Sequence, residues 1–180
     1  MPESTGLLST LLAPCHQATV RRWSKRLDMC FTISDLKLLF EKRIPPVVGD
    51  YFLGGASDER TLRDNVAAFE YTRFAPNYGV SHDTIDLTTT VAGTEISMPV
   101  IVGPVGSLRT LWPKGEAIAA KAAGDAGTIS TLSTLTGTRL EEVKAASAHD
   151  CWFQLYLVGG KEVAKKGIQR AKDAGYSALV

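Results

Sequence analysis

After Met98 the sequence alternates regularly between short apolar runs and helical segments, and this alternation constrains the fold more than any other feature. Three runs are predicted as strands, each is followed by a segment with helical periodicity, and a fourth strand begins at Ser177. The predicted strands are Pro99–Gly103, Thr128–Leu132 and Cys151–Leu157, and the helices are Gly115–Ala126, a segment opened by the capping box Thr138-x-x-Glu141, and Lys161–Ala174. Such alternation indicates βαβ units and a parallel sheet.

The sequence before Met98 is organised differently, as short helices followed by a hairpin. The helices are predicted over Asp35–Lys42 with Ser34 as cap, over Val47–Leu53, and over Asp58–Phe69 with Ser57 as cap. Two strands, Asp86–Val91 and Glu95–Met98, are predicted to turn at Ala92-Gly93. We therefore expect an N-terminal helical segment and a β-hairpin ahead of the alternating part.

Residues 1–34 form a separate Ser/Thr-rich segment with a basic cluster at Arg21, Arg22, Lys25 and Arg26. A flexible extension is the favoured interpretation, with a start of translation at Met29 as a variant of it. A transit peptide is the alternative, because such leaders are basic and poor in acids. A secretory signal is not favoured, since the apolar stretch precedes the basic cluster.

Charge and cysteine content exclude several classes of protein. The chain has 180 residues with 20 Lys+Arg against 19 Asp+Glu, so its net charge gives no reason to expect nucleic acid as a partner. Cys15, Cys30 and Cys151 are too widely spaced for a disulfide scaffold or a zinc site, and no metal is expected. We predict a cytoplasmic protein, and leave membrane association and organellar targeting open.

In parallel β/α folds, ligands bind at the carboxyl ends of the strands. Here those ends carry a glycine-containing loop, Gly103–Ser107, and a hydroxyl-rich stretch, Ser130–Thr134. The third strand places Trp152, Gln154 and Tyr156 on one face, because strand side chains alternate. An ordinary turn explains the first stretch equally well, and most runs like the second are only turn chemistry. For the third, an antiparallel strand with one solvent-exposed face is the alternative.

From about Asp35 onward the chain resembles the FMN-dependent α-hydroxy acid dehydrogenase/oxidase family, which includes glycolate oxidase, L-lactate dehydrogenase and mandelate dehydrogenase. The similar segments keep the family's order and spacing over about four fifths of the chain. They include Pro46–Phe52 with Gly54-Gly55-Ala56, Asp86–Thr90, Ile96–Pro99, Gly103-Pro104, Leu111–Glu116, Leu132-Ser133 and Trp152–Tyr156.

The resemblance implies a fold, a cofactor and a set of site residues. The fold would be the N-terminal portion of a (β/α)8 TIM barrel, with about three βα units. The cofactor would be FMN, held by Pro104, Val105, Gly106, Ser133 and Gln154. Tyr51 and Tyr156 would bind the substrate, and Tyr156 would also be catalytic. Neutral phenols can orient a 2-hydroxy acid and stabilise developing charge without adding a titrating group. A purely structural role for Tyr51, beside Gly54-Gly55, is the alternative.

Two departures from the family bear on these expectations. Val105 stands where members often carry threonine, and the family's base histidine, substrate-binding arginines and flavin-facing lysine lie downstream of Val180. We therefore expect residues 35–180 to be a barrel portion truncated at its fourth strand, inactive alone. Full-length, it would oxidise a small 2-hydroxy acid, pass electrons to oxygen, a cytochrome or a quinone, and form a homo-oligomer. The alternatives are an inactive half-barrel and another FMN barrel enzyme, such as type 2 isopentenyl diphosphate isomerase.

Overall fold

The structure, a computed structural model, describes residues 27–180, which divide into two compact units. One unit ends at Glu70, and the other runs from Tyr71 to Val180. The predicted extension over residues 1–34 lies mostly outside the described residues, as do Cys15 and His16.

The N-terminal unit consists of short helices, as expected. They are α2 (Ile33–Glu41), α3 (Pro46–Leu53) and α4 (Arg60–Ala67), followed by a 3-10 turn, η1 (Ala68–Tyr71). Helix α2 begins earlier than predicted because Thr32, not Ser34, is its cap. The Thr32 hydroxyl accepts from the Asp35 N–H at 3.2 Å and the Asp35 carboxylate accepts from the Thr32 N–H at 2.9 Å, which completes a capping box.

Helix α4 begins later than predicted. Ser57 does not cap it, because Ser57 and the cap residue Glu59 both have positive φ angles, of 54° and 58°. A residue with a left-handed backbone cannot be part of a right-handed helix, so the chain turns at Ser57 and Glu59 and α4 starts at Arg60. The unit buries little apolar surface: Gly49 is the buried residue among its described helices.

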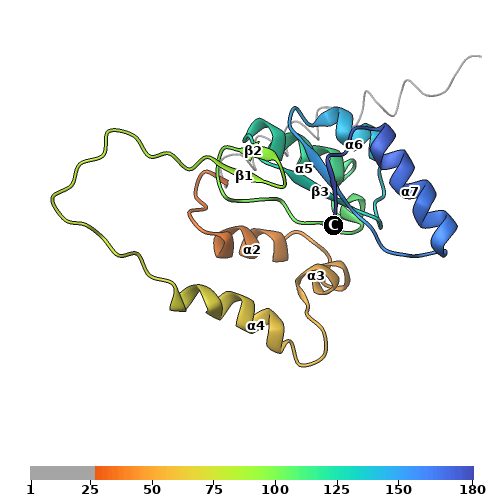
Figure 1. The fold of residues 1–180 in the computed structure, drawn as a ribbon. Coiled ribbons are helices and arrows are strands. Elements are labelled where there is room, and N and C mark those ends of the chain that lie inside the picture. Colours follow the sequence, from red (N-terminus) through yellow and green to blue (C-terminus); the bar gives the residue numbers. More distant parts are fainter. Residues whose placement is uncertain (1–26) are drawn as a thin grey trace, which may run out of the picture. The chain divides into compact units, whose positions relative to one another are not determined.

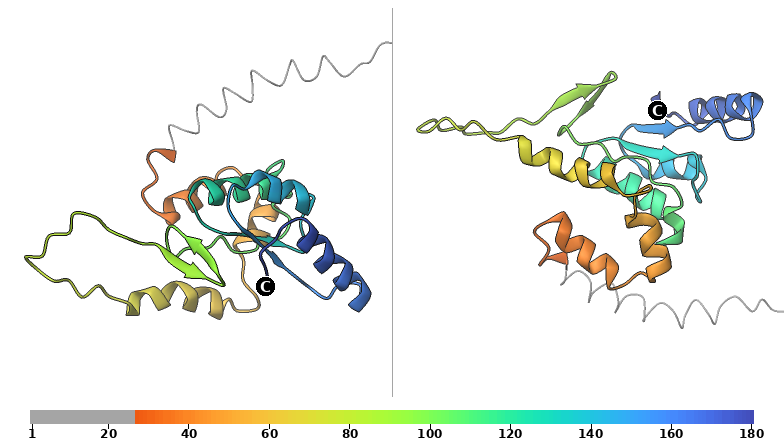
Figure 2. Two further views of the ribbon diagram at one scale, coloured as in Figure 1. Left: turned by 45° about the horizontal axis from the view of Figure 1, so that its top comes forward. Right: turned by 90° about the horizontal axis from the view of Figure 1, so that it is seen from below.

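The second unit opens with the predicted hairpin. Strands β1 (Thr89–Val91) and β2 (Thr94–Ile96) pair antiparallel, with Val91 opposite Thr94. Ala92 and Gly93 both have positive φ, of 48° and 83°, as a two-residue turn of the type that suits hairpins requires. The hairpin is a separate two-stranded ribbon in Figure 2. The predicted position of its turn is confirmed.

The predicted parallel sheet is also present. Strands β3 (Ser130–Ser133), β4 (Cys151–Gln154) and β5 (Ala178–Leu179) lie in this order and pair in parallel. The connections run through α6 (Leu140–Ala146) and α7 (Lys161–Asp173), while α5 (Gly115–Asp125) precedes β3 (Figure 1). Two consecutive βαβ units are thus formed as expected.

The core of this unit lies between the sheet and its helices. Leu132 of β3 and Phe153 of β4 point to one face, where they meet Ala120 of α5, Val143 of α6 and Ala171 of α7. All five are at most 5% exposed. Small residues on α5 and α7 let these helices approach the strands closely, which explains the Ala-rich pattern of the sequence.

The first predicted strand, Pro99–Gly103, is reduced to a single bridge. Val102 pairs with Ser130, donating its N–H to the Ile129 carbonyl and accepting from the Thr131 N–H. The prediction of burial on both faces is wrong for the described chain, because Val100 and Val102 are 57% and 37% exposed. Pro99 lacks an N–H, and the Val100 N–H is used in a tight local turn to Met98, so a regular ladder cannot extend backward.

The predicted capping box at Thr138 and Glu141 does not form. The cap of α6 is Arg139, without a side-chain hydrogen bond. Thr138 instead donates its hydroxyl to Glu116 at 2.8 Å, and Glu141 binds Arg170 at 2.6 Å. Both side chains of the expected box are therefore engaged by other elements of the fold.

Within residues 27–180, no helix combines the length and the apolar character needed to cross a membrane.

Candidate functional site

Three of the residues predicted to bind the cofactor lie together at the carboxyl edge of the sheet. Ser133 and Gln154 end β3 and β4, opposite each other in the ladder, and their side chains hydrogen-bond at 3.3 Å. Gly106 lies beside them: a Cβ added there would be 3.8 Å from the Ser133 hydroxyl and 3.4 Å from Leu135 Cβ. The loop after Val102 and the end of β3 are therefore neighbours, as expected at the carboxyl edge of a parallel sheet.

Hydrogen bonds fix the orientation of the Gln154 side-chain amide. Its Oε1 accepts from the Ser133 hydroxyl and, at 3.4 Å, from the Thr134 N–H. No described residue accepts from its Nε2. Gln154 is half-buried on the face opposite Phe153, as the alternation predicted. The edge of the sheet thus presents an amide donor to a ligand.

The loop of Pro104, Val105 and Gly106 offers a second set of donors. Among the described residues, nothing accepts from the backbone N–H groups of Gly103, Val105 or Gly106. Backbone N–H groups are strong donors that need partners when covered. Together with the Gln154 amide, they fit a planar heterocycle with several acceptors, as the isoalloxazine ring of FMN is.

The two tyrosines predicted to bind substrate are in different units. Tyr156 follows β4 and is 52% exposed, and no described residue bonds its hydroxyl. Tyr51 is on α3, 67% exposed, with its ring edge-on to Phe52 at 5.0 Å. Ser133, Gln154 and Gly106 are brought together by the second unit, and the roles of both tyrosines stay predictions.

Glu116 is a residue that the sequence reasoning missed. It lies in the first turn of α5, is 3% exposed, and its carboxylate binds both neighbouring loops. It accepts from the N–H groups of Arg109 at 3.3 Å and Gly137 at 3.0 Å, and from the Thr138 hydroxyl. Glu116 belongs to the Leu111–Glu116 segment that carries the resemblance, but no local pattern marks it as buried, because the Thr138 hydroxyl that it binds lies 22 residues away.

The environment of Glu116 keeps it ionised. Burial acts to raise the pKa of this carboxyl, but the hydrogen bonds it accepts from both loops and from its own backbone outweigh burial. Its pKa therefore lies below the ordinary value of 4.5. Further bonds join the same loops: Ser107 N–H donates to the Leu135 carbonyl at 2.8 Å, and the Arg109 guanidinium donates to the Gly137 carbonyl at 3.1 Å.

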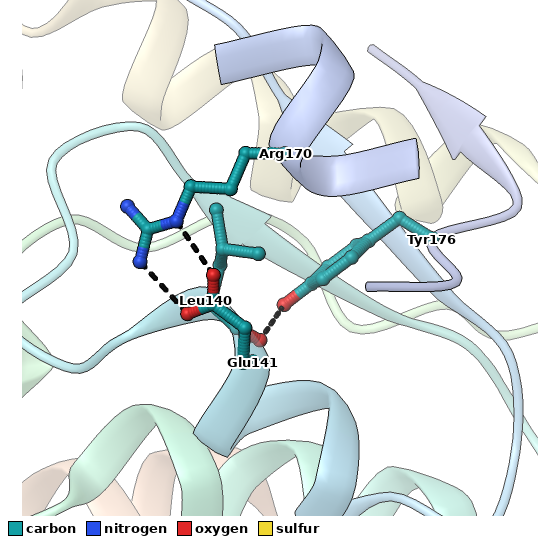
Figure 3. A network of polar contacts seen from close by, with 4 residues as sticks. All are labelled: Leu140, Glu141, Arg170 and Tyr176. Atoms are coloured by element: carbon teal, nitrogen blue, oxygen red, sulfur yellow. Dashed lines mark hydrogen bonds and ion pairs between the residues drawn. The ribbon is translucent and has the colours of Figure 1, made fainter. Parts of the chain in front are cut away.

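A second polar network ties α6 to α7 and to the segment that precedes β5 (Figure 3). The Arg170 guanidinium makes two bonds to Glu141, at 2.6 and 2.7 Å, and lowers the pKa of Glu141 to about 2. The Tyr176 hydroxyl donates to the Leu140 carbonyl at 2.8 Å. Burial raises the pKa of Tyr176, so the phenol stays protonated.

Comparison with known proteins agrees with this arrangement. Residues 40–180 match the FMN-dependent dehydrogenase family. The chain is 37% identical over 150 residues to (S)-mandelate dehydrogenase of Pseudomonas putida, covering 83% of this chain and 38% of that protein. It is 36% identical to glycolate oxidase 1 of Zea mays over 82% of this chain and 40% of that protein. The chain spans about two fifths of the length of these curated relatives.

Solved structures show the same similarity in three dimensions. A soluble mutant of the membrane-associated (S)-mandelate dehydrogenase from Pseudomonas putida matches with a TM-score of 0.78 at 37% identity, over 83% of this chain and 42% of that one. A mandelate oxidase mutant with a C4a-OH-FMN adduct matches with a TM-score of 0.76 at 31% identity, over 81% of this chain and 44% of that one. The chain belongs to the FMN-dependent dehydrogenase family, and it has the fold of the matching part of these enzymes.

Proposed function

We propose that the intact protein is an FMN-dependent dehydrogenase or oxidase that converts a small 2-hydroxy acid, such as lactate, glycolate or mandelate, to the 2-oxo acid. In this proposal, residues 35–180 form the N-terminal part of a (β/α)8 barrel. The observation that carries it is the convergence of Gly106, Ser133 and Gln154 at one sheet edge, with unpartnered donors around them.

FMN, when bound, would supply the capacity to accept two electrons from the substrate. Pro104, Val105 and Gly106 would lie along its ring. The Gln154 Nε2 and the free N–H groups of the loop would donate to the polar atoms of the ring, while Ser133 fixes the orientation of Gln154.

The two tyrosines would act on the substrate. Tyr51 and Tyr156 would donate from their phenols to the carboxylate and to the substrate oxygen that becomes the carbonyl, which orients the acid and stabilises charge as it develops. By resemblance, the base histidine that takes the proton lies outside the part of the family that this chain matches. The proposal therefore concerns the intact protein.

The test begins with FMN binding and substrate reduction. We expect the purified intact protein to bind FMN stoichiometrically, and one of lactate, glycolate or mandelate to bleach its visible absorption without oxygen. Reoxidation by oxygen, a cytochrome or a quinone then identifies the acceptor, and size-exclusion chromatography with light scattering tests the expected homo-oligomer. A protein that binds no FMN, or whose flavin none of these acids reduces, would contradict the proposal.

A matched pair of glutamines sharpens the assignment of the site. Gln154→Leu removes the free amide donor, and loss of one such hydrogen bond is expected to weaken FMN binding about tenfold. Gln169→Leu is the control, because Gln169 lies on α7 and bonds Asp173 of the same helix. Equal FMN affinities of the two variants would place the ring elsewhere.

A further inference from the structure

Thr134 directly follows β3, and its polar atoms are directed to the end of β4. Its hydroxyl donates to the Gln154 carbonyl at 2.5 Å and accepts from the Tyr156 N–H at 2.9 Å. Its own N–H donates to Gln154 Oε1 at 3.4 Å. One side chain therefore contacts the backbone on both sides of Leu155, and the backbone of the same residue contacts the Gln154 amide.

These bonds continue the link between β3 and β4 beyond the last backbone pair of the two strands. Ser133 and Gln154 are the last paired residues of β3 and β4, so the Tyr156 N–H has no backbone partner on β3. On the other side of β4, the Leu155 N–H donates to the Val180 carbonyl. The Thr134 hydroxyl is thus the group that holds the Gln154–Tyr156 segment toward β3. A hydroxyl suits this place because a single oxygen can both donate and accept.

We propose that Thr134 is a positioning residue: it fixes the backbone of Gln154–Tyr156, and through it the amide of Gln154 and the phenol of Tyr156. This inference rests on the proposed function, because those two side chains are the ones assigned there to FMN and to the substrate. Thr134 itself needs no contact with either ligand.

The expected loss of catalytic rate on removal of the Thr134 hydroxyl follows from the geometry. Without the hydroxyl, the Gln154 carbonyl and the Tyr156 N–H lose their partner, and the exposed segment after β4 has few other bonds to hold it. Misplacement of a reacting group by about 1 Å can cost about a hundredfold in rate. We expect Thr134→Val to lower kcat with the 2-hydroxy acid by about ten- to a hundredfold, with a smaller change in KM.

Three further substitutions accompany Thr134→Val in this test. Thr134→Ser keeps the hydroxyl and should retain kcat within about threefold. Thr134→Ala, which removes the hydroxyl and leaves a smaller side chain, should lower kcat as Thr134→Val does. Thr136→Val is the matched control: its hydroxyl also donates to a carbonyl and accepts from an N–H, but both belong to Thr138, away from β4. A loss of stability alone would appear in Thr136→Val as well.

Three measurements on the FMN-loaded intact protein decide between positioning and a merely structural role. They are kcat and KM, the visible absorption spectrum of the bound flavin, and amide hydrogen exchange at Tyr156. We expect Thr134→Val and Thr134→Ala to alter all three, and Thr134→Ser and Thr136→Val to leave the spectrum and the Tyr156 exchange at wild-type values.

Unchanged kcat, spectrum and exchange in Thr134→Val or Thr134→Ala would overturn the positioning role, whatever the stability of the variant. The positioning role is also overturned if Thr136→Val matches their losses, or if Thr134→Ser fails to restore kcat. Failure of the proposed function appears separately, in the wild-type protein, as absence of FMN binding or of flavin reduction. Hydrogen exchange at Tyr156, measured on the intact protein without FMN as well, tests the contact independently of that function.

Discussion

The loops that follow β3 and β4 are neighbours at the same sheet edge, yet they are built very differently. The β3 loop, residues 134–139, is held by Glu116, by Arg109, by Ser107 and by the end of β4. The β4 loop, residues 155–160, is exposed after Leu155, with Leu157 and Val158 at 75% and 62%. The groups proposed to face FMN thus lie beside a firmly bonded loop, whereas the β4 loop is bonded at Leu155 and Tyr156 and is exposed beyond them.

The difference fits two tasks at this sheet edge, holding a bound cofactor and admitting a substrate. A cofactor that stays bound is served by donors already in place, because binding then costs little ordering entropy. A substrate must enter and its product leave, and a loop with few bonds permits this motion. Substitutions in and around both loops test whether the β3 loop is as firmly fixed as its hydrogen bonds indicate.

The largest expected effect comes from Glu116→Leu. The substitution leaves the N–H groups of Arg109 and Gly137 and the buried hydroxyl of Thr138 without their acceptor, and we expect a loss of about 3 kcal/mol in the free energy of unfolding. Urea denaturation at neutral pH measures it. Glu142→Leu is the control, because Glu142 is exposed on α6 and should change stability by less than about 0.5 kcal/mol. Similar losses in both variants would show that the carboxylate does not hold the loops.

The pH dependence of stability gives a second, smaller effect at the same residue. The pKa of Glu116 is lower in the folded protein than in the unfolded chain, so its ionisation contributes stability that is fully present above about pH 4.5. This contribution is lost as pH falls through the folded pKa. We expect Glu116→Gln to flatten the wild-type decrease of stability below that pH. Parallel pH profiles for the two proteins would contradict the assignment.

A pair of tyrosines compares a half-buried, hydrogen-bonded hydroxyl with an exposed one. Tyr176→Phe removes the bond to the Leu140 carbonyl and should cost about 1 kcal/mol in thermal or urea unfolding. Tyr156→Phe, at the exposed β4 loop, should change stability by less than about 0.5 kcal/mol while impairing oxidation of the hydroxy acid. If Tyr156→Phe were the more destabilising variant, the contrast between the loops would be wrong.

The smallest effect is expected at the ion pair of Glu141 and Arg170. Both side chains are about half exposed, so water and salt screen the pair. Because the pKa of Glu141 is about 2, its carboxylate stays charged in the folded protein below the ordinary 4.5, and its contribution fades as pH falls toward 2. Glu141→Gln should lower the melting temperature slightly in low salt and not in high salt. A salt-independent loss would indicate a role beyond the charge.

Local sequence signals predicted the local parts of this fold well. The Ala92-Gly93 turn and helices α5 and α7 lie within a few residues of their predicted bounds, because φ preferences and periodicity are set by near neighbours. Ser133 and Gln154, which the resemblance assigns to FMN, lie side by side because parallel strands bring their carboxyl ends to one edge, while their role in binding FMN stays a prediction.

Features decided by distant residues were missed. Thr138 looks like a cap, but its hydroxyl bonds Glu116, which lies 22 residues away, and no local pattern reveals that competition. The length of β4 was overestimated for a similar reason: the apolar run continues to Leu157, but backbone pairing with β3 ends at Gln154 and the Thr134 side chain takes over.

The carboxylate of Glu116 also limits how much the β3 loop can vary in length. A residue inserted between Thr134 and Arg139 would shift Gly137 and Thr138 away from their common acceptor and break several bonds at once. A residue inserted between Leu157 and Val158 would break none of the hydrogen bonds that fasten the sheet edge. Tags, epitopes or engineered extensions of the chain therefore belong in the β4 loop, where added length is tolerated without loosening that edge.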